Sequence, residues 1–378
     1  MLFAMGTLIK RLPVFLVPVL LIICSSCTAI RTIWWGHADV DDYKKFSSVP
    51  IQKSGSPVQF YTHSGNKLLK IPNFPLVPRD TTSLDNFLDQ NHTLCFILIR
   101  NDTILYERYF KGYNRESVFP SFSISKSVVS ALTGIAMKEH AIKNLQQPVT
   151  DFIPEMKDAG FAKVTIDDLL SMRSGIRFRE EYSSPFGEIA RFYYGKNLKK
   201  YTVDLKTESA PGVIYNYQSA NAELMSLILE KATGKKINQY LEEKIWKPAG
   251  MESDATWSTD NKKHQTIKAF CCITARGMDY ARFGELYLHD GKNGQVQVIP
   301  EEWIKETSKI KYNSRDSEGF PYTYFWRVTE KGNLFAKGVL GQYIFICPHK
   351  NIVVVRLGEG TGHISWARFI EQLVEELQ

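Results

Sequence analysis

Ser123 and Lys126 are the residues whose types and spacing point most directly to chemistry. The segment that follows them has the apolar periodicity of a buried helix that begins near Ser123. Residues three apart share one face of a helix, so the serine hydroxyl and the lysine amine can meet at its first turn. That turn also leaves backbone N–H groups without partners, and the N–H of Ser123 can hold an oxyanion. The pattern predicts Ser123 as a nucleophile and Lys126 as its proton acceptor.

The same tetrad has a plain structural alternative. Ser-x-x-Lys occurs by chance in many chains, where the serine caps a helix and the lysine is solvated. Here the following helix is largely apolar, and a lysine on its buried side needs a reason to be there.

The composition of the 378 residues is that of a globular protein, with 44% hydrophobic and 23% charged residues. This length allows two domain-sized cores, or one domain with a large insertion. The net charge of +7 is spread along the chain, and its densest runs are residues 196–200 and 262–263. No basic stripe alternates with aromatic residues, so we expect no nucleic-acid partner and interpret these lysines as a solvated face.

The N-terminus has the pattern of a targeting segment. Lys10 and Arg11 precede an apolar run at residues 12–24, which is shorter than the about 20 residues that span a bilayer and is typical of a signal peptide. Ser25-Ser26-Cys27 resembles the end of a bacterial lipoprotein signal, although Cys24 stands where an aliphatic residue is usual. We predict lipidation at Cys27 and export to the bacterial cell envelope, with the protein anchored to the membrane and facing the periplasm or the exterior. An uncleaved anchor is the alternative.

Four cysteines follow this segment, at positions 95, 271, 272 and 347. Their spacing fits no zinc pattern, so no metal site is predicted. Cys95 and Cys347 lie in apolar runs typical of strands, which favours buried small hydrophobes. A disulfide among the four remains open, because an exported protein meets an oxidising environment.

Strand patterns lie at both ends of the chain that follows the leader. Residues 93–100 and 103–110 form a hairpin pattern, and residues 334–339, 342–347 and 352–357 are further strands. The region between them is mostly helical, which indicates the α+β class: an antiparallel sheet flanked by N- and C-terminal helices, with a large helical insertion. The predicted segments are a signal peptide in 1–27, an extended leader in 28–80, an α/β part in 81–120 and 266–378, and a helical part in 121–265.

Four stretches, in order, resemble the serine β-lactamase and penicillin-binding-protein superfamily. They are residues 123–126, 164–175, 211–219 and 336–342. The closer resemblance is to class C β-lactamase-related hydrolases, which include esterases, D-amino-acid peptidases and 6-aminohexanoate-dimer hydrolases. It runs from about residue 80 to the C-terminus. It implies a β-lactamase/transpeptidase-like fold and a serine hydrolase that needs no metal or cofactor.

The resemblance assigns roles to particular residues. Ser123 becomes the acylated nucleophile, Lys126 the base that activates it, and Tyr217 the second proton carrier. Tyr215 competes for the last role, since it shares a face with Tyr217 on a strand-like approach. Ser219 stands where asparagine is common in the family.

The third box departs further from the family pattern. Lys-Thr-Gly or His-x-Gly is typical, whereas this chain has Ala336-Lys337-Gly338. Lys337 does not simply replace the missing group at Ala336, because neighbouring strand residues point to opposite faces. Gly338 allows close approach of a substrate, and the N–H of Val339 supplies the second oxyanion donor. Ser219, Gly338 and Lys337 are the predicted substrate-binding residues.

The predicted activity is cleavage of an amide or ester bond in a small molecule or peptide, through an acyl-enzyme on Ser123. The alternatives are a penicillin-binding D,D-peptidase, a β-lactamase, which the departures at Ala336 and Ser219 disfavour, and a membrane-tethered binding or sensor domain without activity. Residues 180–182 follow the Ser174-Gly175 turn, and a solvated loop is favoured over a role in lining the cleft. The sequence does not identify the acyl donor.

Overall fold

In the computed structural model, the described residues are 28–62, 70, 72 and 83–377. Within them, eight strands form the larger of two main sheets, and every neighbouring pair is antiparallel except β2 and β4. In spatial order these strands are β12 (Tyr322–Thr323), β13 (Trp326–Val328), β14 (Leu334–Gly338), β15 (Gln342–Cys347), β16 (Ile352–Gly358), β3 (Thr93–Arg100), β4 (Thr103–Tyr109) and β2 (Tyr61–Thr62).

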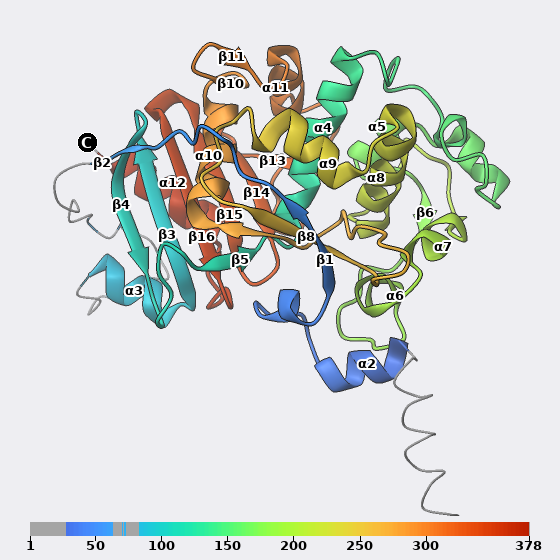
Figure 1. Ribbon diagram of the computed structural model, residues 1–378, viewed down its shortest axis with the longest axis horizontal. Coiled ribbons are helices and arrows are strands. Elements are labelled where there is room, and N and C mark those ends of the chain that lie inside the picture. The colour runs from blue at the N-terminus through green and yellow to red at the C-terminus, as the bar shows by residue number, and fades with distance from the viewer. Residues whose placement is uncertain (1–27, 63–69, 71, 73–82, 378) are drawn as a thin grey trace, which may run out of the picture.

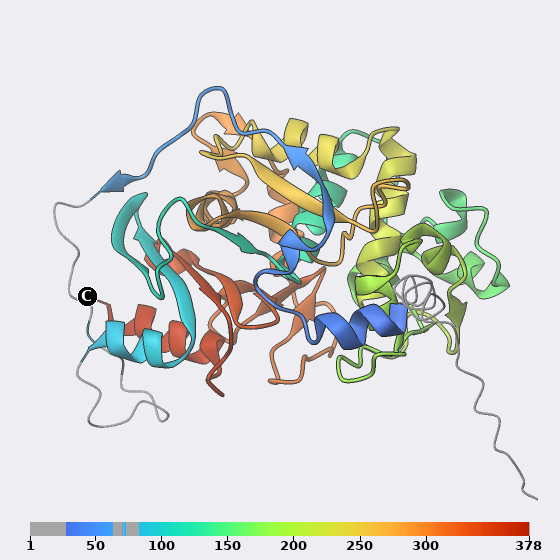
Figure 2. The ribbon, with the colours of Figure 1, turned by 60° about the horizontal axis from the view of Figure 1, so that its bottom comes forward.

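Helices cover both faces of this sheet, as Figure 2 shows. Helix α10 (Gly277–Leu288) packs on one face, and α3 (Leu84–Gln90) and α12 (Trp366–Glu376) pack on the other. All seven residues of β16 are buried, which is why its sequence is β-branched almost throughout. Gly284 lets α10 approach closely, since a Cβ there would lie 2.7 Å from a methyl carbon of Val353.

A smaller sheet joins the leader to the body. Its order is β1 (Ser47–Ile51), β8 (Ala255–Thr259), β9 (Ile273–Arg276) and β5 (Val118–Pro120). Strand β8 lies within the region predicted to be helical, because its pairing with the leader strand β1 is a long-range contact that no local pattern reports. Two-stranded ribbons join β6 (Ile176–Arg177) to β7 (Lys206–Thr207), and β10 (Lys292–Asn293) to β11 (Val296–Gln297).

The helical part lies beside the sheets in Figure 1. Its central helix α4 is buried from Ile124 to Ala136 and packs against α8. Local signals fix several ends: Thr165 and Asp168 form a capping box at α5, and Gly234 ends α8 in the left-handed conformation. No helix among the described residues has both the length and the apolar character to cross a membrane. The helices not yet bounded are α4 (Ile124–Lys138), α5 (Ile166–Leu170), α6 (Glu188–Tyr194), α7 (Leu198–Val203), α8 (Ser219–Thr233), α9 (Ile237–Leu241) and α11 (Glu301–Ser308), with the short turns η1 (Asp42–Lys44), η2 (Val149–Asp151), η3 (Ala159–Lys163), η4 (Glu242–Trp246) and η5 (Pro348–Lys350).

The leader differs from the extended arm predicted from its sequence. Residues 28–35 form helix α2 (Thr28–Trp35), and β1 and β2 join the two main sheets. The helix is stabilised by aromatic contacts with α6, where the Trp35 and Tyr194 ring centroids lie 5.7 Å apart. The predicted signal peptide, the lipidation site at Cys27 and parts of residues 63–82 lie outside the described residues.

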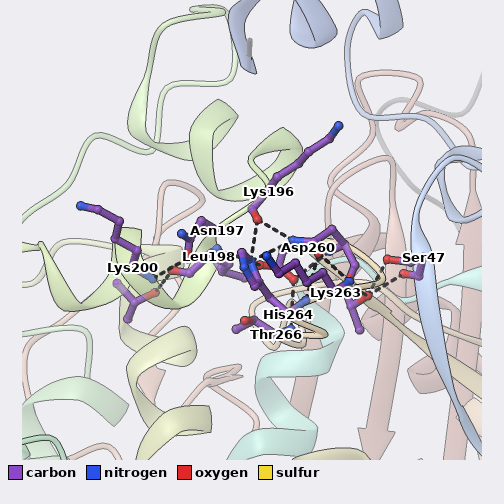
Figure 3. A network of polar contacts seen from close by, with 12 residues as sticks. Ser47, Lys196, Asn197, Leu198, Lys200, Asp260, Lys263, His264 and Thr266 are labelled. Atoms are coloured by element: carbon purple, nitrogen blue, oxygen red, sulfur yellow. Dashed lines mark hydrogen bonds and ion pairs between the residues drawn. The ribbon is translucent and has the colours of Figure 1, made fainter. Parts of the chain in front are cut away.

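The two basic runs meet around a buried carboxylate, that of Asp260 (Figure 3). It accepts hydrogen bonds from the backbone N–H groups of Leu198 at 3.0 Å, Asn261 at 2.7 Å and Thr266 at 3.0 Å. In Figure 3 the ammonium groups of Lys196 and Lys200 point away from this cluster. The lysines of both runs are exposed, which confirms the interpretation as a solvated face.

Candidate active site

Ser123 and Lys126 lie side by side at the start of α4. The Lys126 amine donates to the Ser123 hydroxyl over 2.8 Å and to the carbonyl oxygen of Phe270 over 2.8 Å. The Lys126 side chain is buried, so these two acceptors hold the amine in place. In its neutral form this amine can take the proton of the Ser123 hydroxyl directly.

The turn that carries Ser123 is held by strand β9 through Ile273. Ser121 donates its backbone N–H to the carbonyl of Ile273 over 2.7 Å, and its hydroxyl accepts from the N–H of Ile273 over 3.0 Å. Phe122 then has φ +42°, in the left-handed region that residues other than glycine rarely adopt. This conformation places Ser123 at the edge of the helix rather than within it.

Gly338 lies against the nucleophile turn. A Cβ at this position would lie 2.7 Å from the carbonyl oxygen of Ser121 and 3.1 Å from the Cβ of Phe122. Any side chain there would push β14 away from Ser123. The missing side chain of Gly338 therefore allows strand β14 to approach the protein's own backbone at Ser121.

The structure brings Tyr217, rather than Tyr215, beside Lys126. The Lys126 nitrogen lies 5.1 Å from the centroid of the Tyr217 ring, and the Arg327 guanidinium carbon lies 5.6 Å from it. The Tyr217 ring packs edge-on against Tyr322 at 5.9 Å. A lysine amine and a guanidinium therefore face one phenol ring.

Tyr215 has a different environment. Its ring contacts Tyr322 at 5.3 Å, and its hydroxyl is buried without a hydrogen-bond partner among the described residues. Burial raises the pKa of this phenol well above its ordinary value. Tyr215 is thus a packing residue next to the site.

Sequence reasoning missed Arg327, which lies on β13 and follows no motif. Its guanidinium is buried and paired with Asp316 at 2.6 Å. Burial lowers the pKa of Arg327, but Tyr322, Tyr217 and Asp316 together raise it above the ordinary value. Arg327 is therefore a fixed positive charge beside Tyr217.

Val339 follows β14 and lines the same cavity as Ser123. Neither the N–H of Ser123 nor that of Val339 donates to an acceptor within the described residues. Two free backbone donors at one cavity are what an oxyanion needs, since each can bind the negative oxygen without reorganisation.

Ser219 begins α8 and is bound by a residue that had been interpreted as solvated. Its N–H donates to one oxygen of Glu180 over 2.8 Å, and its hydroxyl donates to the other over 2.6 Å. The Tyr182 hydroxyl also donates to Glu180, over 2.7 Å. The interpretation of residues 180–182 as a solvated loop is therefore wrong for Glu180, whose carboxylate satisfies the open first turn of α8; Glu181 remains exposed.

Lys337 is not brought to the site. Its ammonium pairs with Glu318, which also accepts from the hydroxyl of Ser365. Lys337 shares its face of β14 with Phe335, which belongs to the core beneath α12, whereas Ala336 faces the other core. Alternation along the strand therefore turns Lys337 away from Ser123, which corrects its prediction as a substrate-binding residue.

The cysteines separate into two groups. Cys271 and Cys272 form a disulfide between adjacent residues, and Cys271 lines the cavity at Ser123. Cys95 and Cys347 are free and buried in the two cores, which confirms their interpretation as small hydrophobes.

Two clusters of side chains that could ligate a metal occur in the described part of the chain: Asp102, Glu285 and His289, and separately Cys347, His349 and Glu375. Neither contributes a lining residue to the Ser123 cavity.

The comparisons with known proteins identify the family of the chain. The model of the beta-lactamase family matches residues 84–365. The 6-aminohexanoate-dimer hydrolase of Paenarthrobacter ureafaciens is 26% identical over 297 residues, which cover 72% of this chain and 74% of that protein.

Two solved structures share the fold. A Bacillus anthracis protein provisionally named a 6-aminohexanoate-dimer hydrolase superposes with a TM-score of 0.74 at 22% identity, covering 87% of this chain and 89% of that one. A family VIII carboxylesterase gives a TM-score of 0.61 at 16% identity, covering 78% and 95% of the two chains. At these identities the likeness establishes the fold, and it confirms the predicted α+β, β-lactamase/transpeptidase-like class.

The chain therefore belongs to the beta-lactamase family, as the resemblance implied. It is a serine hydrolase of the β-lactamase-related kind.

Proposed function

We propose that the protein cleaves an amide or ester bond by two-step acyl transfer through Ser123. The observation that carries this proposal is the 2.8 Å contact between the Lys126 amine and the Ser123 hydroxyl, at the edge of a cavity. Support for an amide or ester also comes from the relatives, since one is named for an amide dimer and another is a carboxylesterase.

In the first step the Ser123 oxygen attacks the carbonyl carbon while its proton passes to neutral Lys126. The negative oxygen that forms is held by the N–H groups of Ser123 and Val339. Tyr217 or Lys126 then protonates the departing amine or alcohol, the bond breaks, and an ester to Ser123 remains. In the second step water loses a proton to the same base and attacks this ester, and the returning proton regenerates Ser123.

A β-lactamase or a D,D-peptidase is the less favoured reading. The position of the family's usual polar group is occupied by Ala336, and the neighbouring Lys337 is paired with Glu318 on the other face of β14. The substrate carboxylate that such enzymes recognise would lack this partner. A binding domain without activity is also disfavoured, because Ser123 and Lys126 are present and in contact.

We further propose that the protein is exported and anchored to the membrane through a lipid on Cys27. Helix α2 starts at Thr28, and its Ile33 and Trp34 side chains are 67% and 84% exposed, as suits a segment close to lipid. A Cys27→Ser variant is expected to leave the membrane fraction after cell lysis. Retention of this variant in the membrane would favour the uncleaved anchor instead.

The test of the hydrolase proposal is the intact mass of residues 28–378 after treatment with a fluorophosphonate and, separately, with penicillin. We expect one fluorophosphonate adduct, which Ser123→Ala abolishes and Lys126→Ala slows. A persistent penicillin adduct would move the assignment to a penicillin-binding peptidase. Failure of both reagents to label a folded sample would leave the binding-domain alternative.

A further inference from the structure

A cavity of about 400 Å³ opens beside Ser123, within the range of small-molecule sites, about 300–1,000 Å³. Its walls come from the nucleophile turn, from α6, from the turn after β14, and from α2 with the residues up to Ala38. Helix α2 lies next to α6 in Figure 1, so a leader segment encloses the reactive serine from one side. The described residues that line the cavity include no Asp, Glu, Lys or Arg.

The leader wall is fixed by two tyrosines of α6. The Tyr194 hydroxyl donates to the carbonyl of Gly36 over 2.8 Å, and the Tyr193 hydroxyl donates to the carboxylate of Asp42 over 2.9 Å. Each phenol hydroxyl therefore already donates its hydrogen to an acceptor in the leader. Both tyrosines line the cavity, so it gains their apolar ring surface while their hydroxyls are already engaged.

The cavity lies on the acyl side of the bond to be cleaved. Ser123 and the oxyanion donor Val339 line it, whereas Tyr217 and Lys126 do not. A leaving group must depart next to its proton donor, and both candidate donors are outside the cavity. The space beside Ser123 is therefore left for the part of the substrate that stays attached to the serine.

We propose that this cavity binds the apolar acyl chain of an uncharged ester or amide, and that α2 and the residues up to Ala38 form the wall that limits its length. The inference rests on the proposed acyl transfer at Ser123. A charged acyl group would lose its hydration among these largely apolar walls, and the described lining residues offer it no Asp, Glu, Lys or Arg, only the imidazole of His37, as a charged partner. An apolar chain gains up to about fourfold in affinity for each methylene that it buries.

The first arm of the test measures kcat/KM for p-nitrophenyl esters from acetate to octanoate, so that the leaving group stays constant. We expect a rise of two- to fourfold per added methylene until the cavity is filled. A p-nitrophenyl ester whose acyl chain ends in a carboxylate is expected to react at least tenfold more slowly than the neutral ester of equal length. A flat profile, or a preference for the anionic ester, would overturn the inference.

The second arm places one charge at two sites on the same helix. Thr32 lines the cavity, whereas Trp34 is 84% exposed and does not line it. Thr32→Glu is expected to lower kcat/KM for hexanoate at least tenfold and to leave acetate within threefold, while Trp34→Glu leaves both unchanged. Retained acetate hydrolysis shows that the variant folds. Equal responses of the two variants would refute α2 as the wall.

A third variant narrows the cavity from helix α6. Ala190 lies on α6 and lines the cavity, so Ala190→Phe is expected to shift the preferred acyl chain to a shorter one. An unchanged chain-length profile would count against the inference. If instead no ester were hydrolysed and no fluorophosphonate adduct formed on Ser123, the proposed acyl transfer itself would have failed.

Discussion

The clusters around Asp260 and Ser123 use their polar groups in opposite ways. Both oxygens of Asp260 are occupied by backbone N–H donors, which tie loops together at the surface end of β8 (Figure 3). At Ser123 the reverse holds among the described residues: the N–H groups of Ser123 and Val339 and the hydroxyl of Tyr217 have no partner. Buried polar groups are normally satisfied. A group left with open capacity beside a cavity is therefore available to a substrate.

The largest effect should come from removing the base at the Ser123 cluster. Lys126→Met keeps the volume of the side chain but cannot accept a proton, so we expect kcat to fall about 10²–10⁴-fold. The assay is hydrolysis of a p-nitrophenyl ester, with circular dichroism as the control for folding. Activity within tenfold of the wild type would remove Lys126 from the chemistry.

The opposite outcome is expected at the Asp260 cluster. Asp260→Ala leaves one buried N–H group, that of Leu198, and two part-buried ones without their acceptor and should lower the free energy of unfolding by about 2–4 kcal/mol. Urea unfolding measures this loss, and kcat/KM of the folded variant should stay within twofold. Asp260→Asn retains one acceptor oxygen and should lose less. An Asp260→Ala variant that keeps its stability but loses activity would contradict the contrast between the Asp260 and Ser123 clusters.

Tyr217 and Tyr215, whose rings both pack against Tyr322, sharpen the comparison within one site. Tyr217→Phe removes the hydroxyl of the ring that faces Lys126 and should lower kcat about 10–10³-fold. Tyr215→Phe removes a buried hydroxyl without a described partner, so activity should change less than threefold and the free energy of unfolding should stay constant or rise by up to about 1 kcal/mol. Steady-state kinetics and urea unfolding of both variants decide the assignment. The reverse ranking would make Tyr215 the proton carrier.

The smallest effect concerns the half-exposed cluster of His289, Glu285 and Asp102. The hydrogen bond to Glu285 raises the pKa of His289 to about 9 against the effect of burial, and Asp102 acts in the same direction. Burial raises the pKa of Glu285 although His289 opposes it. Two carboxylates, those of Asp102 and Glu285, face the His289 ring and favour its charged form.

A raised pKa means that the folded state holds the proton more tightly than the unfolded state. The stabilisation from His289 is therefore complete below pH 6.5 and is lost as the pH rises towards 9. Because the side chain is 40% exposed, solvent screening limits the effect to below about 1 kcal/mol. Urea midpoints between pH 6 and 10 should fall more steeply for the wild type than for His289→Gln. Parallel curves would show that the cluster contributes nothing.

Local patterns in the sequence predicted much of the fold and the centre of the site. The boundaries of β3 and β15 match their predicted ranges, and the antiparallel hairpin of β3 and β4 is confirmed. The contact between Ser123 and Lys126 follows from helical spacing alone. Each of these features depends on residues close together in the chain, where periodicity and turn residues carry the information.

The sequence by itself thus determined that Ser123 and Lys126 meet at the start of a helix, and it located the strands that flank them. Only the tertiary structure placed Glu180 on Ser219, set Arg327 beside Tyr217, turned Lys337 towards Glu318 and laid α2 along the cavity. These contacts join residues that are distant in sequence, and the free energy that fixes them comes from packing and charge pairing in the assembled fold. No local propensity reports that free energy, so the walls of the cavity, and with them the choice of acyl group, were decided by the tertiary structure.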